Sequence, residues 1–417
     1  MPSRIVPVVV QQHVEDAAVL HNTRSILSKA PHVKLHHLRR FDDRIAAHLD
    51  GLSVAGEEGW PLCEAALEAP DSGAMFTAAI RALQDKRSDR LDRLIALAAA
   101  TPESQSGLRS AFGWVESHEL RGIVSALLAS TDPLRRLIGI AASAMHRVDP
   151  GLISARRLED PEPAVRARAF RTAAELGKRE LVSSLAASVN DDDPICQLWA
   201  AWSAVVLGDR ESALDALQAG AGLPGPMQER AFHLALLAMP LERAHAALRP
   251  LAQQPDDARS LITGSGLAGD PTYVPWLIGR MADDKLARVA GESFSLITGV
   301  DLAWLDLERK PPEAFESGPN DDPQDADTGM DPDDGLPWPE QAKVQTWWNG
   351  HGARFTAGIR HFMGAALSRS QCVEVLKSGY QRQRIAAAYH LCLLDPGTPL
   401  FEWRAPAWRQ QRELARM

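Results

Sequence analysis

The chain has 417 residues, 45% of them hydrophobic and 24% charged, with a formal net charge of −9 and a mean hydropathy of −0.20. This composition is typical of a soluble chain that is long enough for two or three domains or for one long array of repeats. It excludes a strongly basic nucleic-acid-binding protein, and no apolar stretch reaches the length of a membrane span.

The cysteines indicate a reducing compartment. They lie far apart and form no Cys-x-x-Cys pair, so neither a zinc knuckle nor a disulfide framework is indicated. The four residues are Cys63, Cys196, Cys372 and Cys392. We interpret them as buried free thiols, and we expect the protein to be cytoplasmic.

The first 125 residues are predicted to be helical without a clear repeat. Apolar patterns of helical period, separated by Pro, Gly and Ser turns, place helices at residues 14–27, 34–52, 60–67, 75–83, 91–99 and 120–128. Gly51 is the expected C-cap of the second helix. His32 and His36 stand at helical spacing, but no acidic partner set accompanies them. We therefore predict no metal site and interpret these side chains as solvated or capping.

One sequence pattern then occurs three times. It begins at Asp132-Pro133, Asp160-Pro161 and Asp193-Pro194, each five residues before a large apolar side chain and an Ala-rich run. Aspartate can accept a hydrogen bond from a free amide of a first helical turn, and proline fixes a helical φ where its missing N–H costs nothing. The pattern therefore predicts three helix starts, 28 and 33 residues apart.

A fourth start stands at Asp284, 91 residues after the third, and weaker copies lie between them at residues 226–237 and at Asp256. A period of about 30 residues with a helix pair in each unit is the signature of an alpha-solenoid, in which stacked units bury one another's apolar stripes. The pattern resembles the HEAT-like repeat family, most closely over residues 160–177. We therefore predict an all-α fold, an alpha-solenoid of HEAT-like helix pairs with helical caps at both ends.

Arginines recur at the starts of the repeat helices. They are Arg135, Arg136, Arg166, Arg168 and Arg171. In a structural interpretation each arginine bridges to an aspartate of an adjoining repeat and fixes the stacking angle. In a functional interpretation they form a basic stripe on the concave face, suited to phosphates or to an acidic partner.

An acidic, proline-rich segment follows the repeats. Residues 311–342 hold ten Asp or Glu and no Lys or Arg, so the rest of the chain sums to about +1. We consider a solvated loop, a docking loop for a basic partner, and a calcium site. The calcium interpretation is the least favoured of the three, because an EF-hand register begun at Asp325 would need Glu where Leu336 stands. The candidate docking residues are Asp321, Asp322, Asp325, Asp327, Asp331, Asp333, Asp334 and Trp338.

The remainder of the chain is predicted to close the solenoid. Helices are expected at residues 339–348, 371–377 and 382–394, with a short strand or turn within 354–363. The aromatic side chains of the tail, Phe401, Trp403 and Trp408, are expected to fold back onto the repeats. The predicted division is a helical N-terminal region at 1–125, a solenoid at 126–302, an acidic loop at 303–340 and a C-terminal cap at 341–417.

No catalytic constellation is apparent. Gly264-Ser265-Gly266 is expected in a turn between helices, without the strand-to-helix elbow that activates a serine. The glycine-rich residues 220–225 lack the Gly-Lys-Ser/Thr ending of a phosphate-binding loop. We therefore predict that the chain is not an enzyme and binds no cofactor.

Three further stretches carry a closer resemblance. They are residues 50–60, residues 290–302, and residues 318–323 taken with Leu336-Pro337-Trp338-Pro339. They resemble a bacterial family of HEAT-like proteins encoded beside type VI secretion genes. The resemblance implies a cytoplasmic accessory of a contractile secretion machine that binds an effector, adaptor or spike component. Two alternatives stay open: a nucleic-acid-binding solenoid, as some HEAT-like DNA glycosylases are, and an immunity protein whose acidic loop plugs a toxin.

Overall fold

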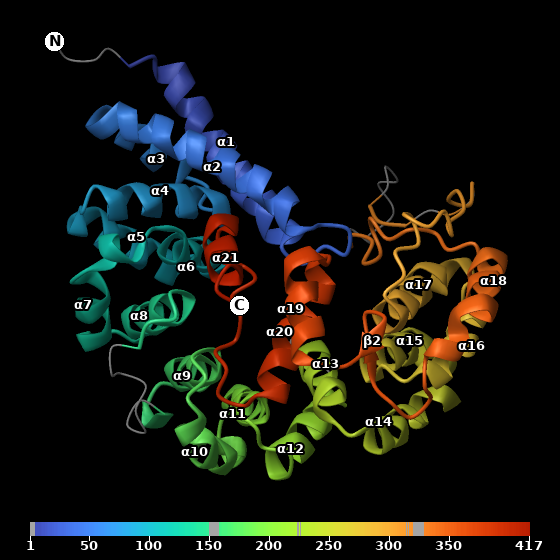
Figure 1. Cartoon of the computed structure of the whole chain (residues 1–417). Helices are drawn as coiled ribbons and strands as arrows, with labels where there is room; N and C mark the ends of the chain where they lie inside the picture. Colours follow the sequence, from blue (N-terminus) through green and yellow to red (C-terminus); the bar gives the residue numbers. More distant parts are fainter. Residues whose placement is uncertain are drawn as a thin grey trace. The chain divides into compact units, whose positions relative to one another are not determined.

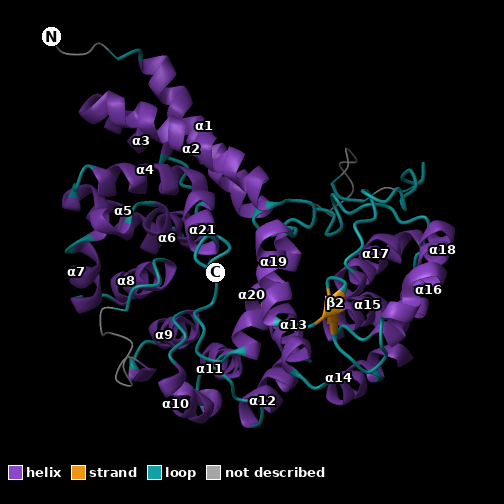
Figure 2. Ribbon diagram, viewed as in Figure 1, coloured by secondary structure: helices purple, strands orange, loops and turns teal. Residues whose placement is uncertain are grey.

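The computed structural model describes residues 5–149, 158–222, 225, 227–313, 315, 317–319 and 329–417. The described residues are mostly helical (Figures 1 and 2), which confirms the predicted all-α repeat fold. The contacts between residues group the chain into two compact units. Unit 1 comprises Met1–Lys29, Val33–Gly208 and Pro396–Met417, and unit 2 comprises Ala30–His32 and Asp209–Asp395. These limits differ from the four predicted segments, and that finer division stays a prediction.

Most of the helices of unit 1 form two rows. Its helices are α1 (Pro7–Leu27), α2 (Leu35–Ala55), α3 (Trp60–Ala66), α4 (Ser72–Gln84), α5 (Ser88–Ala100), α6 (Gln105–Trp114), α7 (Ile123–Ala129), α8 (Pro133–Met145), α9 (Pro163–Glu175), α10 (Val182–Ala187), α11 (Pro194–Val206) and α21 (Ala407–Leu414). Helices α4, α6, α8, α9 and α11 pack on one another in succession, and α5, α7 and α10 form the second row (Figure 1). Each row covers the apolar stripe of the other, as stacked repeats require.

The helix starts follow the predicted cap chemistry in two of the three repeats. Asp132 accepts from the Leu134 amide at 2.8 Å, and Asp193 accepts from the Ile195 amide at 2.9 Å. The second start was predicted wrongly at Asp160-Pro161, because α9 begins two residues later at Pro163. Pro163 provides the helical φ of the first turn there, and the Asp160 carboxylate is left for another role.

Helices α1 and α2 extend beyond their predicted limits, α1 at its start and α2 at its end. Gly51 was expected to end α2, but the helix continues to Ala55 and ends at Gly56, which has a φ of +57°. A Cβ on Gly51 would lie 2.6 Å from the ring of His13 on α1. Gly51 therefore serves the close packing of α1 against α2, while Gly56 adopts a positive φ that glycine reaches without steric cost.

The C-terminal segment, residues 396–417, packs along unit 1. Its Leu400 amide donates to the Glu175 carbonyl at the end of α9, and Arg409 donates to the Gly113 carbonyl of α6. Trp408 meets Trp114 edge to face, with ring centroids 5.0 Å apart. The predicted return of the tail onto the repeats is confirmed, and the segment continues past them to α2.

Unit 2 repeats the two-row arrangement. Its elements are α12 (Ser212–Ala221), α13 (Gln228–Ala238), α14 (Leu241–Leu248), α15 (Ala258–Ala268), α16 (Val274–Arg280), α17 (Asp284–Thr298), α18 (Gln341–His351), β1 (His361–Phe362), β2 (Ala365–Ala366), α19 (Arg369–Ser378) and α20 (Gln381–Leu394). Helices α13, α15 and α17 pack in succession, with α12, α14 and α16 against them. The two short strands form an antiparallel pair, and β1 contacts α17.

The Gly264-Ser265-Gly266 stretch lies inside α15, so its placement in a turn was wrong. A Cβ on Gly266 would lie 2.9 Å from the Cα of Ser293 on α17. The glycine allows the two helices to approach closely, and the Ser265 hydroxyl donates to the Leu261 carbonyl of its own helix at 2.8 Å. These residues therefore serve helix packing.

Candidate functional site

Two of the predicted arginines join successive repeats. Arg136 on α8 binds Asp160 at 2.9 Å, and Arg166 on α9 binds Asp191 at 2.8 Å. Each guanidinium also donates to the backbone carbonyls five and six residues before it. The hydrogen bond from Arg166 lowers the pKa of Asp191 below its ordinary value. The structural interpretation is therefore confirmed for these two arginines, which hold the stacking of α8, α9 and α11.

Arg168 and Arg171 pair with Glu175 of their own helix, at 2.6 and 2.7 Å, whereas the structural interpretation expected each to bridge to an aspartate of an adjoining repeat. Burial alone would raise the pKa of Glu175, but the two guanidinium charges outweigh it and hold that pKa below its ordinary range. On α6, burial and the charges of Arg168 and Arg171 lower the pKa of Arg109. We call these three arginines and Glu175 the arginine cluster. Arg109 forms no ion pair within the described part of the chain.

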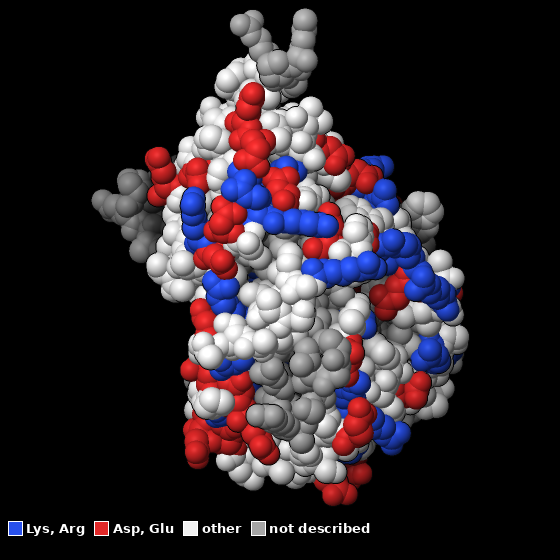
Figure 3. All heavy atoms as spheres, turned by 90° about the vertical axis from the view of Figure 1, so that its left-hand side faces the viewer, with Lys and Arg blue, Asp and Glu red and all other residues white. Residues whose placement is uncertain are grey.

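Arg135 lies closer to the surface. Its guanidinium reaches Asp92 of α5 at 2.8 Å, and its own N-cap residue Asp132 at 3.8 Å. All five predicted arginines thus have carboxylate partners within unit 1. These five arginines do not form a continuous basic stripe. On the face of the molecule shown in Figure 3, Lys and Arg side chains are intermixed with Asp and Glu, and neither sign makes an unbroken patch.

The described end of the acidic segment is bound within unit 2. Arg288 on α17 pairs with Asp331 at 2.7 Å, and Arg259 on α15 pairs with Asp333. Trp338 is buried, with the Arg288 guanidinium 4.7 Å from its ring centroid. In this conformation these three predicted docking side chains serve the fold of unit 2, and their contact with a partner stays a prediction.

Among the other predicted docking residues, Asp334 is exposed. The rest, Asp321, Asp322, Asp325 and Asp327, lie outside the described residues. Over the ranges that are described, no group of three or more His, Cys, Asp or Glu side chains could hold a metal ion.

A turn that joins α17 to the acidic segment presents Trp304 to solvent. Leu302 and Leu307, 2% and 9% exposed, anchor the two ends of the turn in the core of unit 2, while Trp304 between them is 85% exposed. The turn is closed by its own hydrogen bonds, because the Asp301 carboxylate accepts from the Trp304 amide at 3.1 Å and Leu307 donates to the Leu302 carbonyl at 2.8 Å. The indole is therefore displayed by an ordered loop.

The next helix holds this turn in place. Lys343 on α18 donates to the Asp306 carbonyl at 2.8 Å, and Asp306 has a φ of +53°, a left-handed conformation that Asp tolerates better than most residues. On the other side, the Tyr380 hydroxyl donates to Asp301 at 3.0 Å. Because the turn is held from both sides, the position of Trp304 is set by the fold.

Beside the turn lies a cavity of about 340 Å³, which we call the tryptophan pocket. Its lining side chains include Val300, Asp301, Trp304, Leu305, Trp347, His351 and Arg354. The His351 ring stacks on Trp347 with centroids 4.6 Å apart and planes 13° apart, and the Arg354 guanidinium lies 5.3 Å from the Trp347 centroid. The pocket thus combines two indoles with a cation.

Sequence reasoning missed Trp304 and Arg354 as functional candidates. A tryptophan flanked by leucines suggests a core position, and the sequence could not show that the flanking Leu302 and Leu307 point inward while Trp304 points outward. The available signal was a single tryptophan between two aspartates, Asp301 and Asp306, immediately after the predicted end of the solenoid.

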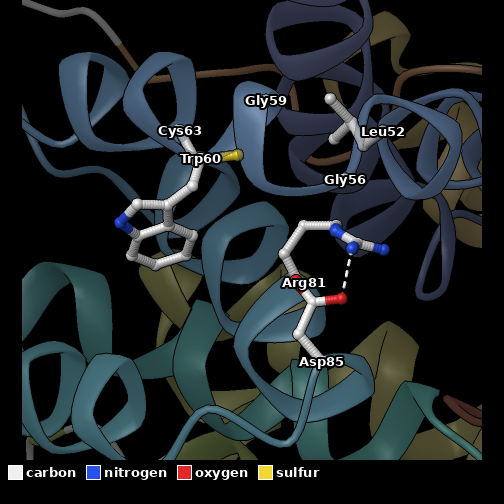
Figure 4. A pocket seen from close by; sticks show the side chains of 7 residues that line it. All are labelled: Leu52, Gly56, Gly59, Trp60, Cys63, Arg81 and Asp85. Atoms are coloured by element: carbon white, nitrogen blue, oxygen red, sulfur yellow. Dashed lines mark hydrogen bonds and ion pairs between the residues drawn. The ribbon is translucent and has the colours of Figure 1, made fainter. Parts of the chain in front are cut away.

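A second hollow lies between α2, α3 and α4 (Figure 4). Arg81 of α4 and Asp85, the C-cap residue of that helix, form an ion pair beside Cys63 of α3. Burial raises the pKa of the Cys63 thiol to about 12, so the thiol stays protonated at neutral pH. The hollow leaves no room for a water molecule. Its geometry is that of a packed junction between helices and not of a reactive centre.

Comparison with known proteins supports the repeat architecture. Residues 150–230 match a family model described as HEAT repeats. The matched range spans α9 to α12, so this part of the chain is similar to HEAT repeats. Searches of curated proteins and of solved structures found no match. Among the helices of the described ranges, none has the length and apolar character needed to cross a membrane.

Proposed function

We propose that this protein is a non-enzymatic protein-binding scaffold, and that it acts as an accessory of type VI secretion which holds an effector, adaptor or spike component. Stacked helical repeats provide extended surfaces that commonly serve protein interactions. The resemblance of residues 50–60 and 290–302 to proteins encoded beside type VI secretion genes supports the choice of process. The observation that carries the proposal is the exposed indole of Trp304 at the rim of the tryptophan pocket.

The exposure of Trp304 has a substantial cost in stability. At ~25 cal/mol for each of the ~150–250 Å² that an aromatic side chain can bury, leaving Trp304 85% exposed forgoes about 4 kcal/mol of hydrophobic stabilisation. Tryptophan and arginine are also the residues most enriched among those that dominate binding energy at protein interfaces. An ordered turn that holds an indole outward, beside Trp347 and Arg354, is therefore best explained by a protein partner that covers it.

The non-enzymatic part of the proposal has support from the state of the candidate nucleophiles. Burial raises the pKa of Cys196 and of Cys372 to about 12, as it does for Cys63. The Ser265 hydroxyl is buried in α15 and bonded to its own helix. A thiol that stays protonated and a hydroxyl that faces no base are poor nucleophiles.

The two alternatives receive less support. The nucleic-acid alternative required arginines that face outward along one side, and Arg136 and Arg166 are instead bonded between repeats. The immunity alternative required a free acidic plug, and Asp331 and Asp333 at the end of that segment are held by Arg288 and Arg259.

Affinity capture from the native host tests the proposed function. Tagged wild type, Trp304→Ala and a control, Ile359→Ala, would be compared, with bound proteins identified by mass and nucleic acid assayed in the same eluates. Ile359 is another exposed apolar side chain of unit 2. We expect wild type and the control to recover a protein of the secretion apparatus and Trp304→Ala to lose it at least tenfold. Recovery of nucleic acid without a stable protein would overturn the proposal, as would equal recovery by all three forms.

A further inference from the structure

The charge available in the tryptophan pocket is positive. Arg354 is exposed, and in the part of the chain that the structure describes it forms no ion pair. Its guanidinium instead lies 5.3 Å from the Trp347 centroid and 5.0 Å from that of Phe355, which holds it over aromatic faces at the rim. Stacking fixes the plane of a guanidinium and leaves its in-plane N–H donors free for a planar acceptor such as a carboxylate.

The one acidic side chain of the described lining is already occupied. Asp301 accepts from the Tyr380 hydroxyl at 3.0 Å and from the Trp304 amide at 3.1 Å. A cationic ligand would have to compete with those two donors and would also meet Arg354. The lining therefore disfavours a lysine or arginine from a partner and favours an anion.

The volume and the apolar lining of the pocket indicate the size of the ligand and its apolar part. A volume of about 340 Å³ is at the small end of ligand-binding cavities, which span ~300–1,000 Å³. Val300, Leu305 and the two indoles supply an apolar wall. A short piece of chain with one apolar side chain fits these dimensions and surfaces.

We propose that the tryptophan pocket binds a short segment of a protein partner in which an apolar side chain lies next to a carboxylate. The apolar side chain packs against the indoles of Trp304 and Trp347, and the carboxylate forms a planar ion pair with Arg354. This inference rests on the proposed protein-binding function and specifies the chemistry of the partner.

Arg280 offers a matched control for Arg354. It is likewise an exposed arginine of unit 2, with its guanidinium 5.9 Å from the centroid of a tryptophan, Trp276. It is not part of the lining of the tryptophan pocket. Replacing either arginine by glutamine removes the same charge, so a difference between the two variants reports on the pocket and not on net charge.

The test is selection of a random heptapeptide display library against the full-length protein, followed by fluorescence polarisation with the selected peptides. We expect the selected sequences to pair an apolar residue with Asp, Glu or a free C-terminal carboxylate. Replacing that carboxylate by its amide should weaken binding to wild type at least tenfold. Arg354→Gln should weaken binding to the carboxylate peptide to a similar degree and abolish the preference over the amide, Arg354→Lys should restore part of both, and Arg280→Gln should change neither.

Several results would overturn the inference. They are selection of basic peptides, equal binding of the acid and amide forms to wild type, and failure of wild type to select any peptide. Self-association that Trp304→Ala abolishes, measured by sedimentation, would also overturn it, because the pocket would then be filled by a second copy of the chain. Circular dichroism of each variant guards against misfolding. If a partner is captured from the host while no acidic peptide binds, the inference fails and the proposed function stands; if no partner is captured, the function itself fails.

Discussion

Replacing Asp42 by alanine is expected to destabilise unit 1 and to release the C-terminal segment. The Asp42 carboxylate on α2 is completely buried, where it pairs with Arg24 of α1 and accepts a hydrogen bond from the Ala407 amide at the start of α21. Arg24 in turn donates to the Arg404 and Ala405 carbonyls at 3.0 and 2.9 Å. One buried ion pair therefore joins the two N-terminal helices to the far end of the chain.

The size of the effect follows from burial. Removing one partner of a buried ion pair leaves the other charge uncompensated in a poorly solvated site, which costs ~3–5 kcal/mol. The neighbouring Asp43 provides the control, because it pairs with Arg39 at 2.7 Å with side chains 53% and 39% exposed. Exposed pairs of this kind contribute ~0–1 kcal/mol. Asp42→Ala should therefore lower the free energy of unfolding of unit 1 by about 3 kcal/mol more than Asp43→Ala does.

Hydrogen exchange followed by mass spectrometry measures both parts of this prediction. In Asp42→Ala, amides of residues 396–417 should lose protection together with those of α1 and α2, whereas Asp43→Ala should match wild type. Opening free energies of unit 1 that differ by less than 1 kcal/mol between the two variants would refute the reasoning. So would unchanged protection at Ala407.

Two further predictions concern the repeats and the thiols. Because the hydrogen bond from Arg166 lowers the folded-state pKa of Asp191, its stabilisation is present above the unfolded value of ~3.9 and is lost as the pH falls through the folded value. Arg166→Gln should therefore lower the urea midpoint at pH 7 by an amount equivalent to ~1–3 kcal/mol. This difference between the variant and wild type should shrink as the pH approaches 2. An equal difference at both pH values would contradict the assignment of the ion pair. Burial holds the pKa values of Cys63, Cys196 and Cys372 at about 12, and the fourth cysteine, Cys392, is fully buried. Iodoacetamide at pH 8 should therefore add no mass to the native protein and should label it only in denaturant.

The part of the fold that sequence predicted is the part decided locally. Asp132 and Asp193 cap helices through amides two and three residues away, so the pattern of neighbouring residues was sufficient. Asp160 looked the same in sequence, but it accepts from Arg136, 24 residues earlier, and the helix starts at Pro163. A short-range pattern cannot distinguish a cap from a bridge when both use an aspartate beside a proline.

The parts that sequence did not predict depend on long-range packing. Gly51 looked like a helix end because nothing local revealed that His13 would lie against it. The bond between Asp42 and the Ala407 amide spans 365 positions of the chain, so only the folded unit brings the two groups together. The exposure of Trp304 also depends on long-range packing, because the packing of the core determines which of the neighbouring side chains are buried.

Several charged side chains of the described residues are paired within their own unit, and this decides where recognition can occur. Arginines join repeats through Asp160 and Asp191, and two others hold the end of the acidic segment through Asp331 and Asp333. Each of these carboxylates is mostly buried, so a partner that took one would leave an arginine unpaired at a cost of several kcal/mol. Covering Trp304 contributes favourably to the free energy of binding, because it removes apolar surface from water and breaks no existing ion pair. On energetic grounds a partner should therefore engage the tryptophan pocket before the charged surfaces that the sequence first suggested.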